Sequence, residues 1–296
     1  MSAQIVTPPV EPSHVESVCT FGSDHRLVGT LCQPQSGAPK EVAFIMLNAG
    51  VVSRMGPHRF NVKLARHLAE RGFVSLRFDL SGQGDSRPAS GVHSQEEQVM
   101  VDLREALDGV SHQTGIRRFV IAGICSGAVA AYYFAQRDPR VVGTWMLDGY
   151  TFHTWQSHVR RYGGKLIRAL KGLLLNGRAT LQRLFDALKL NALGKGQETV
   201  DYGSNRHPTQ AEYVAAMQKL ADRGARHFMM FSGDIHWYYN YSGQFHDAFG
   251  KHAFAQGVTV EYMPTIDHTL TRLNAQQHVI TRIGTWACTF ANPPSR

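Results

Sequence analysis

The sequence predicts an α/β protein built around a mostly parallel sheet. Short apolar, β-branched runs alternate with helical segments along most of the 296 residues, a pattern typical of parallel strands joined by helices. The run at 41–47 has no polar alternation, which indicates a strand buried on both faces. A chain of this length can bury a large core within a single domain. We therefore expect a sheet covered by helices on both sides.

The expected elements follow one another in a regular order. A β-hairpin comes first, because segments 15–21 and 27–33 alternate around the turn signal Gly22-Ser23-Asp24. Further strands are expected over 41–47, 73–78, 118–122, 141–147, 227–231 and 258–263. Helices are expected near 59–71, 94–111, 128–135, 209–222, 240–255 and 269–288. One stretch, 151–206, interrupts this rhythm.

The run Gly123-Ile124-Cys125-Ser126-Gly127 lies between an expected strand and an expected helix. This arrangement is typical of a nucleophile elbow, with cysteine where serine is usual. Glycines two positions away on either side leave room for the crossing chain, and helix N-terminal amides favour a thiolate. Two other interpretations are a buried structural cysteine in a Gly-rich turn and Ser126 as the nucleophile. The second would require glycines where Ile124 and Ala128 stand.

The elbow, the loop at 79–86 and a late Asp-His pair together resemble the α/β-hydrolase fold family. The closest likeness is to its serine-aminopeptidase-like and acylhydrolase branch, from about residue 15 to 290. In that family the acid follows the strand after the lid and the histidine follows the last strand, which implies Asp234 and His268. Asp148 and Asp267 are rival acids. The cysteine brings the chain nearer to dienelactone hydrolases and polyhydroxyalkanoate synthases, which use a similar cysteine elbow.

The resemblance implies a role for each of these residues. Cys125 would attack the acyl carbon, His268 would move the proton, and Asp234 would orient the imidazole. The oxyanion would lie between the N–H of Ser126 and that of Gly50 or Val51. Two histidines, His58 and His236, are close enough in sequence to the site loops to be candidates for contact with the substrate, the alternative for each being an ordinary surface residue. Asp79 and Asp85 are interpreted as structural residues that tie a loop through bonds to its backbone.

The stretch 151–206 is expected to form a helical lid over the elbow, within a core made of 1–150 and 207–296. Trp155 and later apolar residues recur at helical spacing, and residues 151–200 carry nine Lys or Arg against two acidic residues. Among them, Lys165, Arg168 and Lys171 fall within two turns. They are candidates to bind an acidic carrier protein or the phosphates of CoA, the alternative being a solvated helix face.

Several classes of protein are not expected. No stretch approaches 18 consecutive apolar residues, so we expect no membrane span. The first residues lack the pattern of a secretory signal, so a cytoplasmic protein with reduced thiols is expected. Cysteines at 19, 32, 125 and 288 show no metal-ligand spacing, and no metal or cofactor is predicted. No recognition motif accompanies the basic charge, so nucleic acid is not an expected partner.

The cysteine also indicates the reaction. Its acyl-enzyme would be a thioester, close in energy to acyl-CoA or to a carrier-bound acyl chain. We therefore expect a thioesterase or acyltransferase acting on a small-molecule acyl substrate, with ester or lactone hydrolysis within reach. The alternative is a catalytically inactive protein of the same fold that binds a ligand or a partner.

Overall fold

The computed structural model describes residues 13–47, 49–91, 94–163 and 206–291. Its centre is an eight-stranded sheet in the order β1-β2-β4-β3-β5-β6-β7-β8. The strands are β1 (His14–Phe21), β2 (Leu27–Pro34), β3 (Val42–Met46), β4 (Val74–Phe78), β5 (Arg118–Ile124), β6 (Val141–Leu147), β7 (Arg226–Ser232) and β8 (Val258–Met263). Strands β1 and β2 form the predicted antiparallel hairpin, β2 pairs antiparallel with β4, and all other pairs are parallel.

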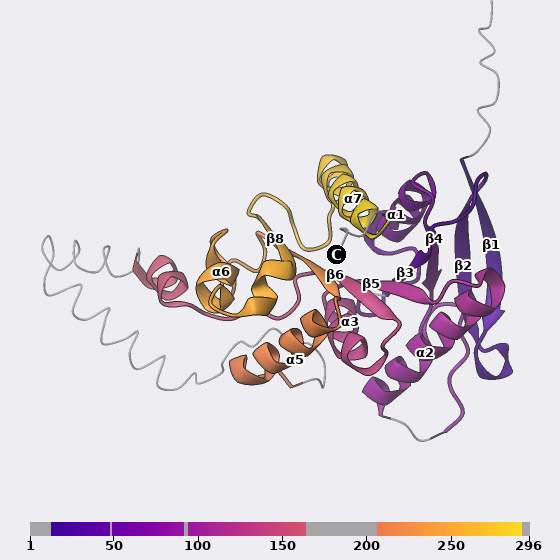
Figure 1. Cartoon of the computed structure of the whole chain (residues 1–296), viewed down its shortest axis with the longest axis horizontal. Coiled ribbons are helices and arrows are strands. Elements are labelled where there is room, and N and C mark those ends of the chain that lie inside the picture. The colour runs from indigo at the N-terminus through magenta and orange to yellow at the C-terminus, as the bar shows by residue number, and fades with distance from the viewer. Residues whose placement is uncertain (1–12, 48, 92–93, 164–205, 292–296) are drawn as a thin grey trace, which may run out of the picture.

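Helices cover both faces of this sheet (Figure 1). Two lie on one side, α1 (Phe60–Ala69) and α7 (Leu273–Ala287), and the other side is covered by α2 (Gln95–Thr114), α3 (Ser126–Arg137), α5 (Gln210–Asp222) and α6 (Gln244–Phe249). Two separate apolar clusters result. In β3, for example, Phe44 packs toward α1 and α7, whereas its neighbour Ile45 packs toward α2 and α3. Every residue of β3 is buried, as expected for a strand covered on both faces.

The loop segments differ from the sequence prediction in two places. The single helix expected over 240–255 is a loop, the short α6 and a 3-10 helix at Ala253–Gly257. The side chain of Gln244 explains part of this difference, because it donates to the carbonyls of Phe152 and Tyr238 and accepts from the N–H of Asn240. Those bonds satisfy the loop backbone without a helix.

The second difference is the start of α7, which begins at Leu273 rather than near 269. The carboxylate of Asp267 accepts hydrogen bonds from the N–H of Thr271 and from the hydroxyl of Thr269. Side-chain bonds of this kind hold the backbone in a turn instead of a helix. They also hold the loop that carries His268.

Only the beginning of the predicted lid belongs to the described residues. A helix runs over 155–163, and its first turn is joined to the loop after β7, where Asn240 donates to the carbonyl of Ser157. Thr154 is hydrogen-bonded to the hydroxyl of Tyr241 at 2.6 Å. Residues 164–205 lie outside the described part, so the division into core and lid stays a prediction. Among the described helices, none is long and apolar enough to cross a membrane.

Candidate active site

The turn between β5 and α3 has the backbone geometry of a nucleophile elbow. Cys125 has φ 57° and ψ −118°, a conformation that non-glycine residues rarely adopt. Strand and helix approach so closely here that a Cβ at Gly123 would overlap the backbone of Gly127. The glycine requirement of the predicted motif therefore has a steric cause. The half-buried Cys125 is held at the start of α3, where helix N–H groups have no acceptor within the helix.

The side chain of Cys125 is hydrogen-bonded to the imidazole of His268. On its other side, the Nδ1–H of His268 donates to Oδ2 of Asp148 at 2.6 Å. The hydrogen bond to Asp148, and next the one to Cys125, raise the pKa of His268 to about 10 in spite of its partial burial. Because that pKa lies well above neutral, the imidazolium is the favoured form of His268 at pH 7.

The residue that orients His268 was expected to be Asp234, and the structure corrects this assignment. Asp234 accepts a hydrogen bond at 2.8 Å from the backbone N–H of His268 and holds the loop rather than the ring. The ring carboxylate is Asp148, which follows β6, the strand before the predicted lid. Asp267, the third candidate, accepts from Thr269 and Thr271 within its own turn.

The carboxylate of Asp148 is positioned by the end of the neighbouring strand. Asp148 has φ 53°, is 2% exposed, and accepts from both the N–H and the hydroxyl of Ser232, at 2.7 and 2.6 Å. The N–H of Ser232 donates to Oδ1, and the Ser232 hydroxyl donates to Oδ2, the same oxygen that bonds to the ring of His268. Sequence reasoning did not identify Ser232, whose only signal was a hydroxyl at the end of a buried strand.

The structure brings one of the two predicted oxyanion elements directly to the elbow. Gly50 lies beside Ser126, and its N–H donates to the Ser126 hydroxyl at 2.8 Å. Ser126 is the first residue of α3, so its own N–H belongs to the helix-terminal donors. Val51 is 89% exposed. In this structure the Gly50 N–H therefore donates to the Ser126 hydroxyl, the bond that an oxyanion would have to replace.

The loop that carries Gly50 is held by the carboxylate of Asp79. Asp79 is fully buried, forms an ion pair with the guanidinium of Arg54, and accepts the Arg54 N–H at 2.6 Å. It also accepts the N–H of Asp85, whose own carboxylate reaches Arg54 at 2.7 Å. These bonds confirm that Asp79 ties the loop through its backbone, whereas the carboxylate of Asp85 pairs with the side chain of Arg54.

The remaining candidate residues lie around this centre or beyond the described part. His58 is exposed in a 3-10 helix (Pro57–Arg59) before α1, and Trp155 is 83% exposed at the start of the helix over 155–163. His236 follows Asp234 by two residues and donates through Nδ1 to the carbonyl of Gly233 at 3.2 Å. The basic candidates Lys165, Arg168 and Lys171 fall within 164–205, outside the described residues.

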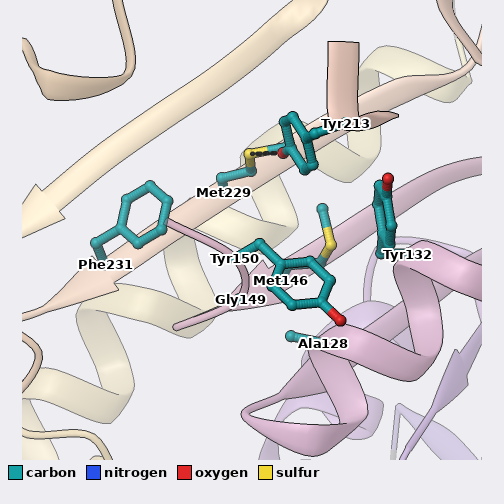
Figure 2. A pocket seen from close by; sticks show the side chains of 8 residues that line it. All are labelled: Ala128, Tyr132, Met146, Gly149, Tyr150, Tyr213, Met229 and Phe231. Atoms are coloured by element: carbon teal, nitrogen blue, oxygen red, sulfur yellow. Dashed lines mark hydrogen bonds between the residues drawn. The ribbon is translucent and has the colours of Figure 1, made fainter. Parts of the chain in front are cut away.

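A small apolar pocket lies between α3, α5, β6 and β7 (Figure 2). It is lined by Ala128, Tyr132, Met146, Gly149, Tyr150, Tyr213, Met229 and Phe231. Its internal space of about 10 Å³ is on the scale of one water molecule, too small for an acyl substrate. We interpret it as packing space behind the loop of Asp148.

Comparison with known proteins supports the fold and the class of protein. The family model described as serine aminopeptidase, S33, matches residues 41–272. Similar solved structures include an esterase from Pyrococcus furiosus, with a TM-score of 0.58, 12% identity, and coverage of 97% of this chain and 95% of the esterase. A dienelactone hydrolase from Anabaena variabilis has a TM-score of 0.51 at 15% identity, with coverage of 93% of this chain and 98% of the hydrolase.

A third similar structure is a cold-adapted esterase from an Arctic intertidal metagenomic library. Its TM-score is 0.51 at 14% identity, over 96% of this chain and 99% of the esterase. At such identities the likeness shows the fold, and it confirms the α/β-hydrolase architecture predicted from the sequence. No curated protein matches the chain.

Proposed function

The chain belongs to the serine aminopeptidase S33 family of α/β hydrolases, and on this premise we propose that it transfers acyl groups through a thioester on Cys125. One observation carries the proposal. The ring of His268 is hydrogen-bonded to Cys125 on one side and to the buried carboxylate of Asp148 on the other. Nucleophile, base and orienting acid within hydrogen-bond reach are the requirement of covalent acyl transfer.

The first half-reaction forms the acyl-enzyme. The pairing with Asp148 favours the imidazolium form of His268, so the ring can hold the proton that the Cys125 thiol gives up. The sulfur attacks the acyl carbon, and negative charge develops on the carbonyl oxygen. The N–H of Ser126 stabilises that charge by donating a hydrogen bond to the oxygen. The bond from carbon to the leaving group then breaks, and the leaving group departs with the proton from His268.

The second half-reaction releases the acyl group. His268, now neutral, accepts a proton from water, an alcohol or an amine as that acceptor attacks the thioester carbon. The carbon–sulfur bond breaks, and the sulfur again shares its proton with His268. Throughout the cycle Asp148 holds the ring in one tautomer and stabilises its positive charge.

The thioester intermediate favours a particular class of substrate. Acyl transfer from CoA or a carrier-bound acyl chain to Cys125 exchanges one thioester for another, so the step is nearly balanced in free energy. Esters and lactones are also able to acylate a thiolate, whereas peptide amides are poorer donors. A thioesterase or acyltransferase is therefore the activity that we propose.

The proposal is tested by intact-mass measurement after incubation with acyl-CoA and acyl-N-acetylcysteamine thioesters. We expect an added acyl mass on the wild-type protein and none on Cys125→Ala. The matched control is Cys288→Ala, which removes an exposed cysteine outside the site and should acquire the same mass as wild type. An adduct on Cys125→Ala would show nonspecific labelling. If no donor labels the wild type, the chain is instead a binding protein of this fold.

A further inference from the structure

A group of cationic and aromatic side chains lies where the loops after β6 and β7 meet the helix over 155–163. It consists of His153, His158, Arg161, Trp237 and Tyr238, which we call the cationic–aromatic cluster. The rings of His153 and His158 are 4.9 Å apart, and the ring of Tyr238 is 6.1 Å from that of His153. His153, His158 and Trp237 are all exposed.

Arg161 is the permanent charge of this cluster. Its guanidinium lies 5.1 Å from the centre of the Trp237 ring, and one of its Nη1–H groups donates to the Trp237 carbonyl at 3.3 Å. Its Nε is buried without a hydrogen-bond partner. Within 13–163 and 206–291, as far as these are described, no carboxylate forms an ion pair with Arg161.

The neighbouring Arg160 has different surroundings. Its guanidinium lies 5.1 Å from the centre of the Tyr241 ring, and the hydroxyl of Tyr241 donates to Asp247 at 2.6 Å. Arg160 thus lies over a ring whose hydroxyl bonds to a carboxylate, whereas the described neighbours of Arg161 are rings, a carbonyl and two histidines. A half-buried guanidinium without a counter-charge is costly, and an incoming anion would lower that cost.

His153 adds a neutral hydrogen-bond donor to the surroundings of Arg161. Partial desolvation of the ring, followed by the charges of His158 and Arg161, lowers the pKa of His153. At neutral pH the His153 ring is therefore uncharged and able to donate one hydrogen bond to a ligand. An oxyanion over the cluster would meet Arg161 as a forked donor and His153 as a single donor.

The position of the cluster relates it to the active site. His153 is five residues beyond Asp148, and Tyr238 is four residues beyond Asp234. At about 3.6 Å per residue, His153 lies no more than about 18 Å from Asp148. Both loops leave the carboxyl ends of parallel strands, the sheet edge where ligands bind in this class of fold.

We propose that the cationic–aromatic cluster binds an oxyanion group, a carboxylate or a phosphate, carried by the substrate that acylates Cys125. This rests on the proposed function, because it assigns the charge of that substrate. A carboxylate would belong to the acyl chain, whereas a phosphate would belong to the leaving group. The two sources share one chemistry, which is recognition by a guanidinium fork.

The experiment measures kcat/KM for four substrates: butyryl and succinyl groups, each on CoA and on N-acetylcysteamine. The variant is Arg161→Gln, and the matched control is Arg160→Gln, which removes the same charge one position away. We expect the wild type to prefer at least one anionic substrate over butyryl-N-acetylcysteamine. In Arg161→Gln that preference falls about tenfold or more, mainly through KM, and in Arg160→Gln it is kept.

The pattern of loss identifies the source of the anion. A loss confined to succinyl substrates indicates a carboxylate on the acyl chain, and a loss confined to CoA substrates indicates a phosphate on the leaving group. The proposal is overturned if Arg161→Gln lowers kcat/KM equally for all four substrates, or if Arg160→Gln has the same effect. Turnover of the neutral substrate without any preference would reject the inference and leave the proposed function standing.

A second measurement separates the two failures when no substrate reacts. Calorimetric titration with succinate and with inorganic phosphate reports anion binding without chemistry. Binding by the wild type that is weakened in Arg161→Gln would place an anion site on an inactive protein, which overturns the claim that the anion belongs to a substrate. Absence of binding would remove the site itself.

Discussion

Two buried aspartates, Asp79 after β4 and Asp148 after β6, follow parallel strands of the same sheet and have different roles. Asp79 is paired with Arg54, whose charge is permanent, and with two backbone N–H groups. Asp148 is paired with Ser232 and with His268, whose ring gains and loses a proton in the proposed reaction. Position and burial are alike in the two cases, so the partner decides the role. A permanent cation makes a fixed support, and a titratable ring makes a proton-transfer site.

The largest expected effect is that of Asp148→Asn on turnover. The amide cannot stabilise the imidazolium and leaves His268 in the wrong tautomer, so kcat/KM for a neutral thioester should fall by about three to four orders of magnitude. Steady-state kinetics checks this, with circular dichroism as the control for folding. Near-normal turnover would make Asp148 a structural residue like Asp79.

Asp79→Asn should affect stability most strongly. The change leaves Arg54 without its buried counter-charge, so the free energy of unfolding should fall by about 3 to 5 kcal/mol. The matched control is Asp85→Asn, since that carboxylate is largely exposed and its pair with Arg54 is worth at most about 1 kcal/mol. Denaturant unfolding measures both, and equal losses would contradict a special role for the buried carboxylate.

A third buried group, His227, extends the comparison because no carboxylate among the described residues pairs with its ring. Its Nδ1 is hydrogen-bonded to the Thr144 hydroxyl, and burial, with a contribution from the charge of Arg223, lowers its pKa to about 4. The unfolded chain binds the proton near pH 6.5, so this contribution to stability is present above pH 6.5 and is lost as pH falls toward 4. Between pH 6.5 and 5 the loss is about 2 kcal/mol.

The measurement is the free energy of unfolding at a series of pH values for wild type and His227→Gln. The variant should lose less stability on acidification than the wild type. The exposed His58→Gln is a control that should follow the wild-type curve. Parallel curves for wild type and His227→Gln would show that His227 does not titrate as a buried neutral ring.

The smallest effect is expected for Asp234→Asn. The asparagine oxygen can still accept the backbone N–H of His268, so kcat/KM should fall no more than about tenfold. The same kinetic assay used for Asp148→Asn decides this. A loss for Asp234→Asn that exceeds the loss for Asp148→Asn would restore the acid that the family pattern implied.

Local sequence patterns predict most of this fold because strand burial and turn geometry depend on residues that are close together in the sequence. The buried runs become the strands, and the glycines at 123 and 127 lie where strand and helix cross closely. Which of Asp148 and Asp234 bonds to the ring of His268 cannot be predicted from such local patterns. Both follow parallel strands, and the backbone direction at Asp148, together with the bonds from Ser232, determines which carboxylate reaches the ring. These are contacts between segments more than 80 residues apart.

The cationic–aromatic cluster could not be predicted from the sequence either, because it also depends on contacts between distant segments. The basic residues at 160 and 161 were visible as charge, but their surroundings come from the loops after β6 and β7. Only the packing of the helix over 155–163 against those loops distinguishes Arg161 from Arg160. Adjacent residues of identical type therefore acquire different electrostatic environments.

The most direct test of the Cys125–His268–Asp148 arrangement is an NMR titration of the His268 ring. We predict that the ring stays doubly protonated above pH 8, with a pKa near 10, in wild type and in Asp234→Asn. In Asp148→Asn the pKa should fall toward the ordinary value of about 6.5. A wild-type ring that titrates near 6.5, or a pKa lowered by Asp234→Asn and not by Asp148→Asn, would contradict the arrangement.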